Sequence, residues 1–164
     1  MMPATRSAFI NDEHWPDTDG QHINAHGGGI LYRDGVYYWY GEARPRQKGD
    51  VSGVACYSSK DLYNWKNEGL VLAKVEDATS DIADGCIIER PKVVHNPKTN
   101  KFVMWFHLEL RGQGYRAART ALAISDSPTG PFTYVRSLRP NAGTWPVEFP
   151  EDQRTPLDAR PHRR

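Results

Sequence analysis

The stretch ILYRDGVYYWY, residues 30–40, contains two runs of aromatic and aliphatic residues on either side of an Arg-Asp-Gly segment. An Asp-Gly pair between two such runs is a strong signal for a β-hairpin closed by a tight turn. Two further runs of strand-forming residues follow at 53–59 and 65–72, separated by a polar turn. The sequence therefore predicts four short consecutive strands.

The same order of strands and turns recurs further along the chain. The second set of predicted strands covers residues 92–95, 101–106, 121–127 and 132–138. Both sets carry an aromatic cluster on their second strand, and a repeated four-stranded unit is typical of a β-propeller blade. The alternative is a β-sandwich in which two hairpin pairs resemble each other by accident.

The composition favours strands throughout. The chain has 5 Trp, 8 Tyr and 5 Phe, with 14 Gly and 12 Pro to supply turns. Aromatic residues favour strands, and no segment shows a sustained helical period. We therefore predict an all-β fold of the propeller class with about two blades.

The expected organisation places a partial propeller at 22–143, with blade one at about 22–75 and blade two at about 87–140. Residues 1–21 are expected to form a leader, and 144–164 an irregular tail rich in proline and arginine. Because propellers close with about four to eight blades, we expect the chain to be part of a larger protein. Exposed blade edges leave self-association open.

Charge and motifs exclude several classes of function. The formal net charge is +1, so a polybasic nucleic-acid binder is not expected. We find no membrane-spanning apolar run, no signal peptide, and no serine-hydrolase, zincin or Walker motif. Cys56 and Cys86 form no C-x-x-C pair, so we expect no metal site. Two buried free thiols are the preferred interpretation, with a disulfide as the alternative.

Two glutamates occupy comparable places in the two units. Glu42 ends the first aromatic strand, and Glu89 precedes Arg90-Pro91 at the start of the second unit. Carboxylates that face each other across a pocket suit glycoside hydrolysis, in which one donates a proton and another activates water or adjusts that acid. The alternative for each glutamate is a surface salt bridge, with Arg90 as a partner for Glu89.

Two further segments supply candidate ligand contacts. Asn24 and His26 lie in HINAHGGG, residues 22–29, whose three glycines allow a close backbone approach. His26 is a candidate contact for a sugar or a metal ion. The alternative is that its imidazole forms a hydrogen bond to a neighbouring strand. Tyr115 lies in a glycine-rich, charged loop between two strands and is predicted to project into a pocket. Trp39 and Trp105 are expected in the core.

Four segments together resemble glycoside hydrolase family 43, in particular its exo-β-1,3-galactanase branch. They are residues 22–32, 37–42, 88–93 and 125–132, and the resemblance extends over about 20–143. It implies a five-bladed propeller with an axial sugar pocket, and inverting hydrolysis by a general acid glutamate, a carboxylate that adjusts the pKa of that acid, and usually an aspartate base.

By motif position, the resemblance implies that Glu89 is the pKa-adjusting carboxylate and that Glu42 and Tyr115 contact sugar. Asn24-Ala25-His26-Gly27 replaces the first-blade aspartate, which the galactanase branch also lacks. The general acid would come from a blade outside this chain.

The predicted function is exo-acting, inverting hydrolysis of β-1,3-galactan or a related galactoside, with the chain alone expected to be inactive. The alternatives are a non-catalytic carbohydrate-binding fragment and a sandwich-type interaction domain. The expected partner is an oligosaccharide or polysaccharide, with no nucleic-acid or membrane partner. No cofactor is expected to be required; an axial calcium ion is left open, with no residue pattern to support it. Many relatives are secreted or periplasmic, and the localisation of this chain is left open.

Overall fold

The computed structural model describes residues 5–9, 14–47, 50 and 52–140. The expected tail at 144–164 lies outside these residues. The described part is all-β, as predicted, and contains a single three-residue 3₁₀-helix, η1 (Gly114–Arg116). Its strands are β1 (His26–Arg33), β2 (Val36–Ala43), β3 (Gly53–Ser59), β4 (Lys66–Ala73), β5 (Ile87–Asn96), β6 (Lys101–Glu109), β7 (Arg119–Ser125) and β8 (Thr133–Leu138).

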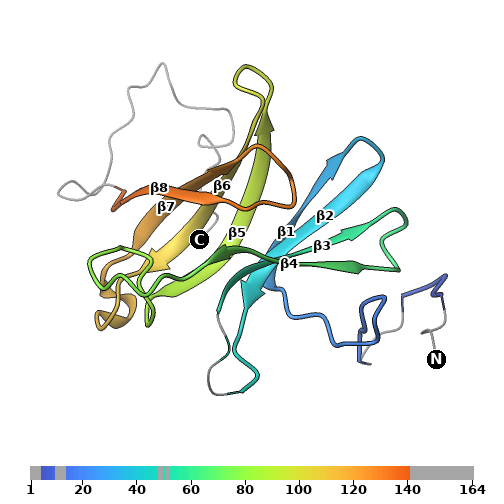
Figure 1. Cartoon of the computed structure of the whole chain (residues 1–164), viewed down its shortest axis with the longest axis horizontal. Coiled ribbons are helices and arrows are strands. Elements are labelled where there is room, and N and C mark those ends of the chain that lie inside the picture. Colours follow the sequence, from blue (N-terminus) through green and yellow to red (C-terminus); the bar gives the residue numbers. More distant parts are fainter. Residues whose placement is uncertain (1–4, 10–13, 48–49, 51, 141–164) are drawn as a thin grey trace, which may run out of the picture.

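The strands form two antiparallel sheets, each in chain order (Figure 1). The first sheet has the order β1-β2-β3-β4 and the second β5-β6-β7-β8. A four-stranded meander of this kind is the topology of a propeller blade. No helix of the described residues has the length and apolar character needed to cross a membrane.

The predicted hairpin at 30–40 is confirmed. Arg33 pairs directly with Val36, so the loop has two residues. Asp34 and Gly35 have φ of 51° and 82°, and positive φ at both central positions is what a type I′ turn requires. This turn matches the twist of the flanking strands, which extend further than the sequence pattern indicated.

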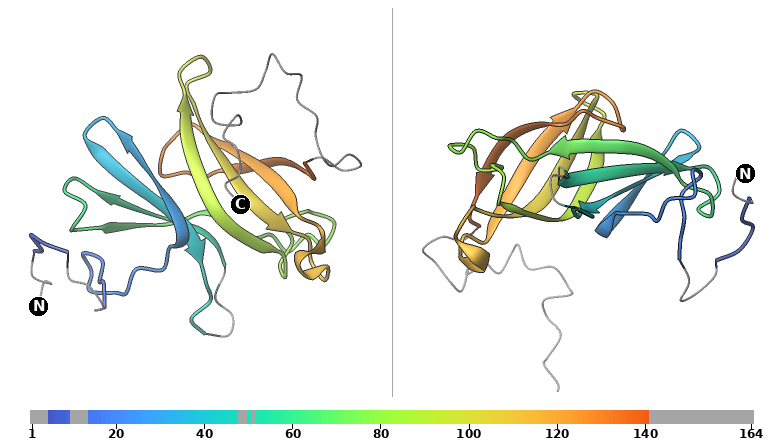
Figure 2. Two further views of the ribbon diagram at one scale, coloured as in Figure 1. Left: turned by 180° about the vertical axis from the view of Figure 1, so that it is seen from behind. Right: turned by 60° about the horizontal axis from the view of Figure 1, so that its bottom comes forward.

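The two sheets diverge from their innermost strands, β1 and β5, which lie side by side (Figure 2). The Lys92 ammonium on β5 donates hydrogen bonds to the carbonyls of Gly27 (3.3 Å) and Gly28 (3.0 Å) on β1. A Cβ at Gly28 would lie 2.3 Å from the Tyr40 carbonyl oxygen, and a Cβ at Gly29 would lie 2.6 Å from the Lys92 side chain. These glycines therefore make room for Tyr40 in the same sheet and for Lys92 on the neighbouring strand, and their approach to a ligand stays a prediction.

A shared core fills the space between the sheets. Tyr40 and Met104, one from each sheet, are fully buried in it. The Tyr40 hydroxyl also donates a 2.6 Å hydrogen bond to the Pro128 carbonyl, which joins the first sheet to a turn of the second. Cys56 and Cys86 are buried free thiols in this core, as preferred, and burial raises the pKa of both.

The prediction that Trp105 belongs to the core is wrong. Its side chain is 44% exposed, because strand neighbours alternate between faces and the adjacent Met104 and Phe106 point into the space between the sheets. Trp39 packs partly buried against Trp15 and Trp65 on the far side of the first sheet, with ring centroids 5.5 and 5.3 Å apart.

We expect Tyr40→Phe to lower the free energy of unfolding by about 0.5–1.5 kcal/mol, because the buried Tyr40 side chain would lose its hydrogen bond to the Pro128 carbonyl. Tyr32→Phe, on an exposed ring, is the matched control and should change it by less than about 0.5 kcal/mol. Urea denaturation of both variants measures the difference. Equal stability of the two would contradict the proposed contact between the sheets.

Candidate active site

Glu89 is placed by an irregularity near the start of β5. The pairing with β6 shifts between Glu89 and Lys92, where Pro91 has no N–H to donate and Arg90 has a φ of 52°. Glu89 lies just before this bulge, directly opposite His107 on β6. Its side chain is 16% exposed, so a carboxylate is held at the end of an innermost strand with limited access to water.

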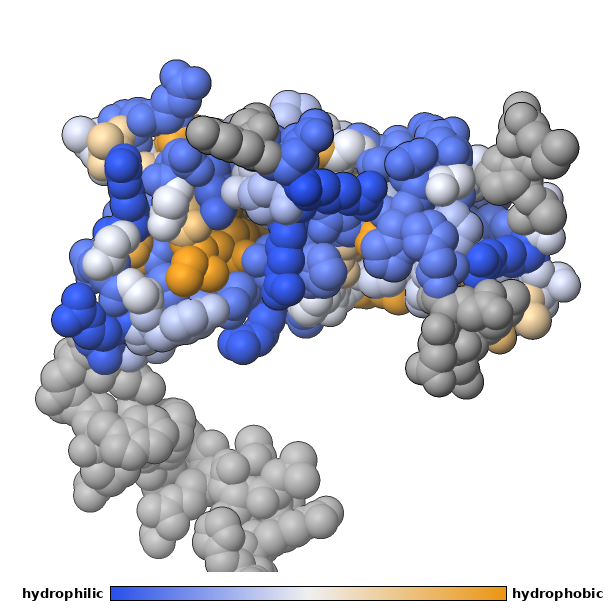
Figure 3. Space-filling view, turned by 90° about the horizontal axis from the view of Figure 1, so that it is seen from below, coloured by the Kyte–Doolittle hydropathy of each residue, from blue (hydrophilic) through white to orange (hydrophobic). Residues whose placement is uncertain are grey.

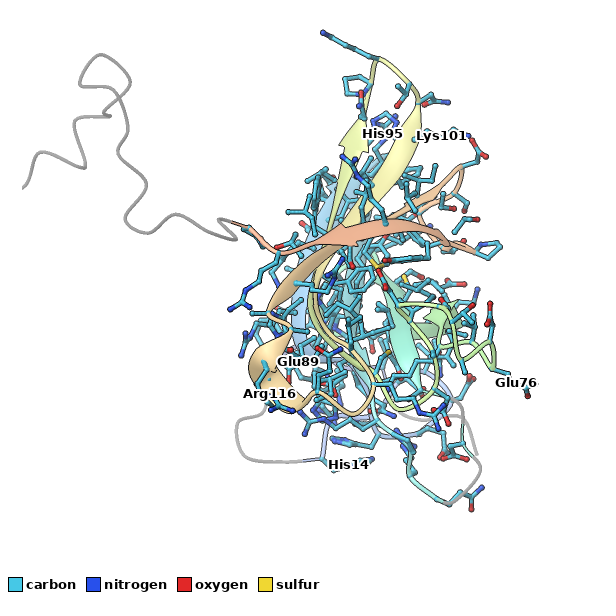
Figure 4. The ribbon with its side chains drawn as sticks, turned by 90° about the vertical axis from the view of Figure 1, so that its left-hand side faces the viewer. His14, Glu76, Glu89, His95, Lys101 and Arg116 are labelled. Carbon is cyan, nitrogen blue, oxygen red and sulfur yellow. The ribbon has the colours of Figure 1, made fainter. Side chains whose placement is uncertain are left out.

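Tyr115 reaches Glu89 from the loop between β6 and β7. Its hydroxyl donates a 2.6 Å hydrogen bond to Glu89 Oε1. Figure 4 shows Glu89 next to Arg116, a neighbour of Tyr115 in η1, at the opposite end of the β5–β6 hairpin from His95 and Lys101. The hydrogen bond to Glu89 raises the pKa of Tyr115, and the charges of Glu89 and Glu42 add to it.

The second carboxylate oxygen of Glu89 has no hydrogen-bond partner among the described residues. The nearest cation is the Arg90 guanidinium, 3.7 Å from Oε2, which is longer than a hydrogen bond. Buried polar atoms are normally paired, so an unpaired carboxylate oxygen at this place is available to accept a hydrogen bond from a ligand.

Glu42 lies near the end of β2, opposite His26 at the start of β1. Its Oε2 is 3.3 Å from the Arg44 guanidinium, so the surface salt bridge considered for this residue is present. The hydrogen bond to Glu42 raises the pKa of Arg44, with a smaller contribution from the charge of Glu89. The two carboxylates therefore lie in the same region, Glu89 near the start of β5 and Glu42 on β2 opposite the start of β1.

Asn24 has a clear structural role. Its side-chain amide donates to the Arg44 carbonyl (2.8 Å), and its side-chain oxygen accepts the Arg44 N–H (3.1 Å). These bonds hold the segment before β1 against Arg44, whose guanidinium forms the ion pair with Glu42. Asn24 and Arg44 also line a polar hollow of about 370 Å³ that Glu89 and Tyr115 do not reach.

Sequence reasoning missed two residues beside this site. His107 pairs with Glu89 across the strands and stacks on the Tyr115 ring, with centroids 6.2 Å apart and planes 18° apart. Glu109, two residues further along β6, is 1% exposed. The alternation on β6 places both on the face that carries Glu89, which is the signal that would have indicated them. The described residues contain no cluster of three or more His, Cys, Asp or Glu side chains suited to a metal ion.

Two consecutive meander blades with a shared core, and carboxylates beside the starts of their innermost strands, define a partial β-propeller with a polar site at that end. No family model and no curated protein matches the chain. Solved structures do match, and all three described below belong to one enzyme family.

A β-1,3-galactosidase of glycoside hydrolase family 43, solved with galactodeoxynojirimycin, is 57% identical over 86% of this chain and 41% of its own, with a TM-score of 0.77. An exo-β-1,3-galactanase from Clostridium thermocellum is 46% identical over 81% and 28%, with a TM-score of 0.70. The exo-β-1,3-galactanase from Phanerochaete chrysosporium, solved with galactose, is 37% identical over 80% and 30%, with a TM-score of 0.72.

The chain therefore belongs to glycoside hydrolase family 43 and resembles its exo-β-1,3-galactanases. The family members are five-bladed propellers, and the two sheets described here correspond to about two blades. The chain spans less than half the length of each of these relatives.

We expect Glu89→Gln to lower the pKa of Tyr115, because the charged acceptor that favours the protonated phenol is lost. A pH titration of tyrosine ¹³Cζ shifts measures this, with Tyr115→Phe to assign the signal. Glu76→Gln, in an exposed loop on the other side of the molecule (Figure 4), should leave it unchanged. An unchanged Tyr115 pKa in Glu89→Gln would contradict the hydrogen bond.

Proposed function

We propose that the protein carrying this chain is an exo-acting, inverting glycoside hydrolase that removes galactose from β-1,3-galactan or a related galactoside. The supporting observation is the 57% identity with a β-1,3-galactosidase over 86% of the chain. Related galactanases were solved with galactose and with β-1,3-galactotriose, which supports an oligosaccharide partner. Inversion needs a protonated acid on one side of the bond and an activated water on the other.

In this proposal Glu89 adjusts the pKa of a general acid that another blade supplies. A carboxylate close to a carboxylic acid disfavours ionisation of that acid and raises its pKa, which keeps the proton available for the leaving group. Tyr115 occupies one oxygen of Glu89, so the other oxygen is free to face the acid or a sugar hydroxyl. Glu89 therefore acts through its charge and its position.

The remaining candidates are assigned to sugar binding. Glu42 and Tyr115 present a carboxylate and a phenol to the same region as Glu89. His26 is exposed at the start of β1, where it can reach a ligand. Asn24 is proposed to act mainly through Arg44, because its side chain is already paired with the Arg44 backbone.

A second candidate function is sugar binding without turnover by the 164-residue chain itself. The described residues bring two glutamates, Glu42 and Glu89, to the region of Tyr115. Glu42 forms an ion pair with Arg44. Glu89 accepts a hydrogen bond from Tyr115 and lies near the Arg90 guanidinium. This is the arrangement expected of a binding surface that lacks its proton donor.

A chimera tests the enzymatic proposal. The matched segment of the 57% identical galactosidase is replaced by this chain, so that the other blades are supplied. We expect release of galactose from β-1,3-galactobiose, and Glu89→Gln should lower kcat by at least about tenfold, in line with acid–base contributions. Glu76→Gln is the matched control and should retain full activity.

The chain alone should release no galactose in the same assay. A folded chimera without activity, or one in which Glu89→Gln keeps full kcat, would contradict the proposed role of Glu89. Galactose release by the chain alone would show that the proton donor lies within these 164 residues.

We also propose that the chain associates with itself through an open sheet face. Val94 and Trp105 are 53% and 44% exposed on the face of the second sheet that points away from the first. Figure 3 views the molecule from the end opposite the His95 hairpin and shows another apolar area, framed by hydrophilic residues, on the half that holds this sheet. Apolar patches of this kind mark interaction sites.

We expect the sedimentation coefficient of the chain to rise with concentration, and Trp105→Lys to reduce that rise by placing a charge on the open face. Lys66→Ala, on the exposed part of β4, is the control and should behave as the unsubstituted chain. A monomer at all concentrations would contradict this proposal.

A further inference from the structure

We propose that the buried Glu109 is a positioning residue that holds Tyr115 on Glu89, acting through the His107 ring and the Ala118 backbone. This inference rests on the proposed function, because the value of the arrangement depends on the roles given to Glu89 and Tyr115. Glu109, His107 and Ala118 lie outside the carboxylate pair formed by Glu42 and Glu89.

Glu109 is a buried acid with two specific contacts. It is the last residue of β6 and is 1% exposed. Its Oε2 accepts the Ala118 N–H at 2.9 Å, and its Oε1 lies 2.8 Å from His107 Nε2. Burial of a carboxylate is costly unless it is hydrogen-bonded, so the bond from the Ala118 N–H offsets part of the cost of burying Glu109.

The first contact closes the loop that carries Tyr115. Glu109 is the residue before this loop, and Ala118 is the last residue before β7. The bond between them therefore ties the two ends of the loop together. Ala118 has a φ of 45°, a left-handed conformation that a non-glycine residue keeps only when its surroundings enforce it. The carboxylate of Glu109 supplies part of that enforcement.

The second contact supports the Tyr115 ring. His107 stands opposite Glu89 in the sheet, and its ring lies nearly parallel to that of Tyr115. Its Nε2 is close to Glu109 Oε1, but this approach does not have hydrogen-bond geometry. The buried Glu109 carboxylate therefore lies in close contact with the His107 ring, and it restrains the ring against which Tyr115 packs.

The contacts form one continuous path from the interior to the site. Glu109 fixes the loop base and the His107 ring, both restrain Tyr115, and Tyr115 occupies Glu89 Oε1 at 2.6 Å. Without Glu109, the Tyr115 hydroxyl is free to leave, and Glu89 then has neither oxygen engaged. Positioning groups of this kind set the geometry on which catalytic contributions depend.

The test reads the Tyr115–Glu89 bond directly in the 164-residue chain. The pKa of Tyr115 is followed by ¹³Cζ NMR in the unsubstituted chain, in Glu89→Gln and in Glu109→Ala. We expect Glu109→Ala to lower the pKa of Tyr115, but by less than Glu89→Gln does, because the hydrogen bond is lost while the charge of Glu89 stays nearby. Glu76→Ala is the matched control and should leave it unchanged. Glu109→Gln, whose oxygen can still accept the Ala118 N–H, should give an intermediate value.

His107→Ala keeps the test decisive if Glu109→Ala does not fold. His107 is partly exposed, so its loss should leave the thermal unfolding transition cooperative while lowering the pKa of Tyr115. If folded Glu109→Ala, or His107→Ala in its place, keeps the Tyr115 pKa of the unsubstituted chain, the positioning role is overturned.

This readout needs neither sugar nor hydrolysis, so it separates the inference from the proposed function. In the chimera, Glu109→Ala should lower kcat more than it raises KM, because the charge environment of the reaction changes more than the sugar contacts. If the chimera is inactive but Glu109→Ala still lowers the pKa of Tyr115, the proposed function is contradicted and the positioning role of Glu109 is supported.

Discussion

The close approach of β1 to β5 is the constraint on which the rest of the structure depends. At Gly29 the backbone of β1 lies against the Lys92 side chain of β5, since a Cβ there would fall 2.6 Å from Lys92 Cδ. Gly28 makes room for Tyr40 within the first sheet. Lys92 then bonds to two carbonyls of β1, and the sheets diverge around a shared core. The starts of both strands consequently meet at one end of the molecule, where Glu42 and Glu89 lie.

The site is built from local departures from regular strand geometry. Pro91 interrupts the β5 ladder, which fixes Glu89 just before a bulge. The short helix η1 carries Tyr115 back to the same carboxylate, while Glu109 is buried beneath the loop. Regular strands supply the scaffold, and the irregular segments between and within them supply the polar groups. This division is common in proteins whose binding residues lie on loops of a rigid framework.

Short-range patterns made much of the fold predictable. The Asp-Gly pair predicted the first hairpin and its tight turn, and the repeat of that unit predicted the second sheet. The repeat pointed to Glu42 and Glu89, the glycine-rich loop pointed to Tyr115, and the family resemblance implied their roles, which remain proposals. The structure brings the three residues together. Trp105 was wrongly placed in the core because aromatic character alone does not reveal which face of a strand is covered. The contacts of Glu109 with Ala118 and His107 depend on how an irregular loop folds back, and no sequence period records that.

The most direct measurement of the central claim is a nuclear Overhauser experiment on the labelled chain. The account predicts cross-peaks between the Gly29 α-protons and the Lys92 side-chain methylene protons, because a Cβ at Gly29 would fall 2.6 Å from the Lys92 Cδ. These residues are far apart in sequence, so only adjacent innermost strands produce such a contact. Assigned spectra in which each sheet shows its internal cross-peaks but none joins Gly29 to Lys92 would contradict the account.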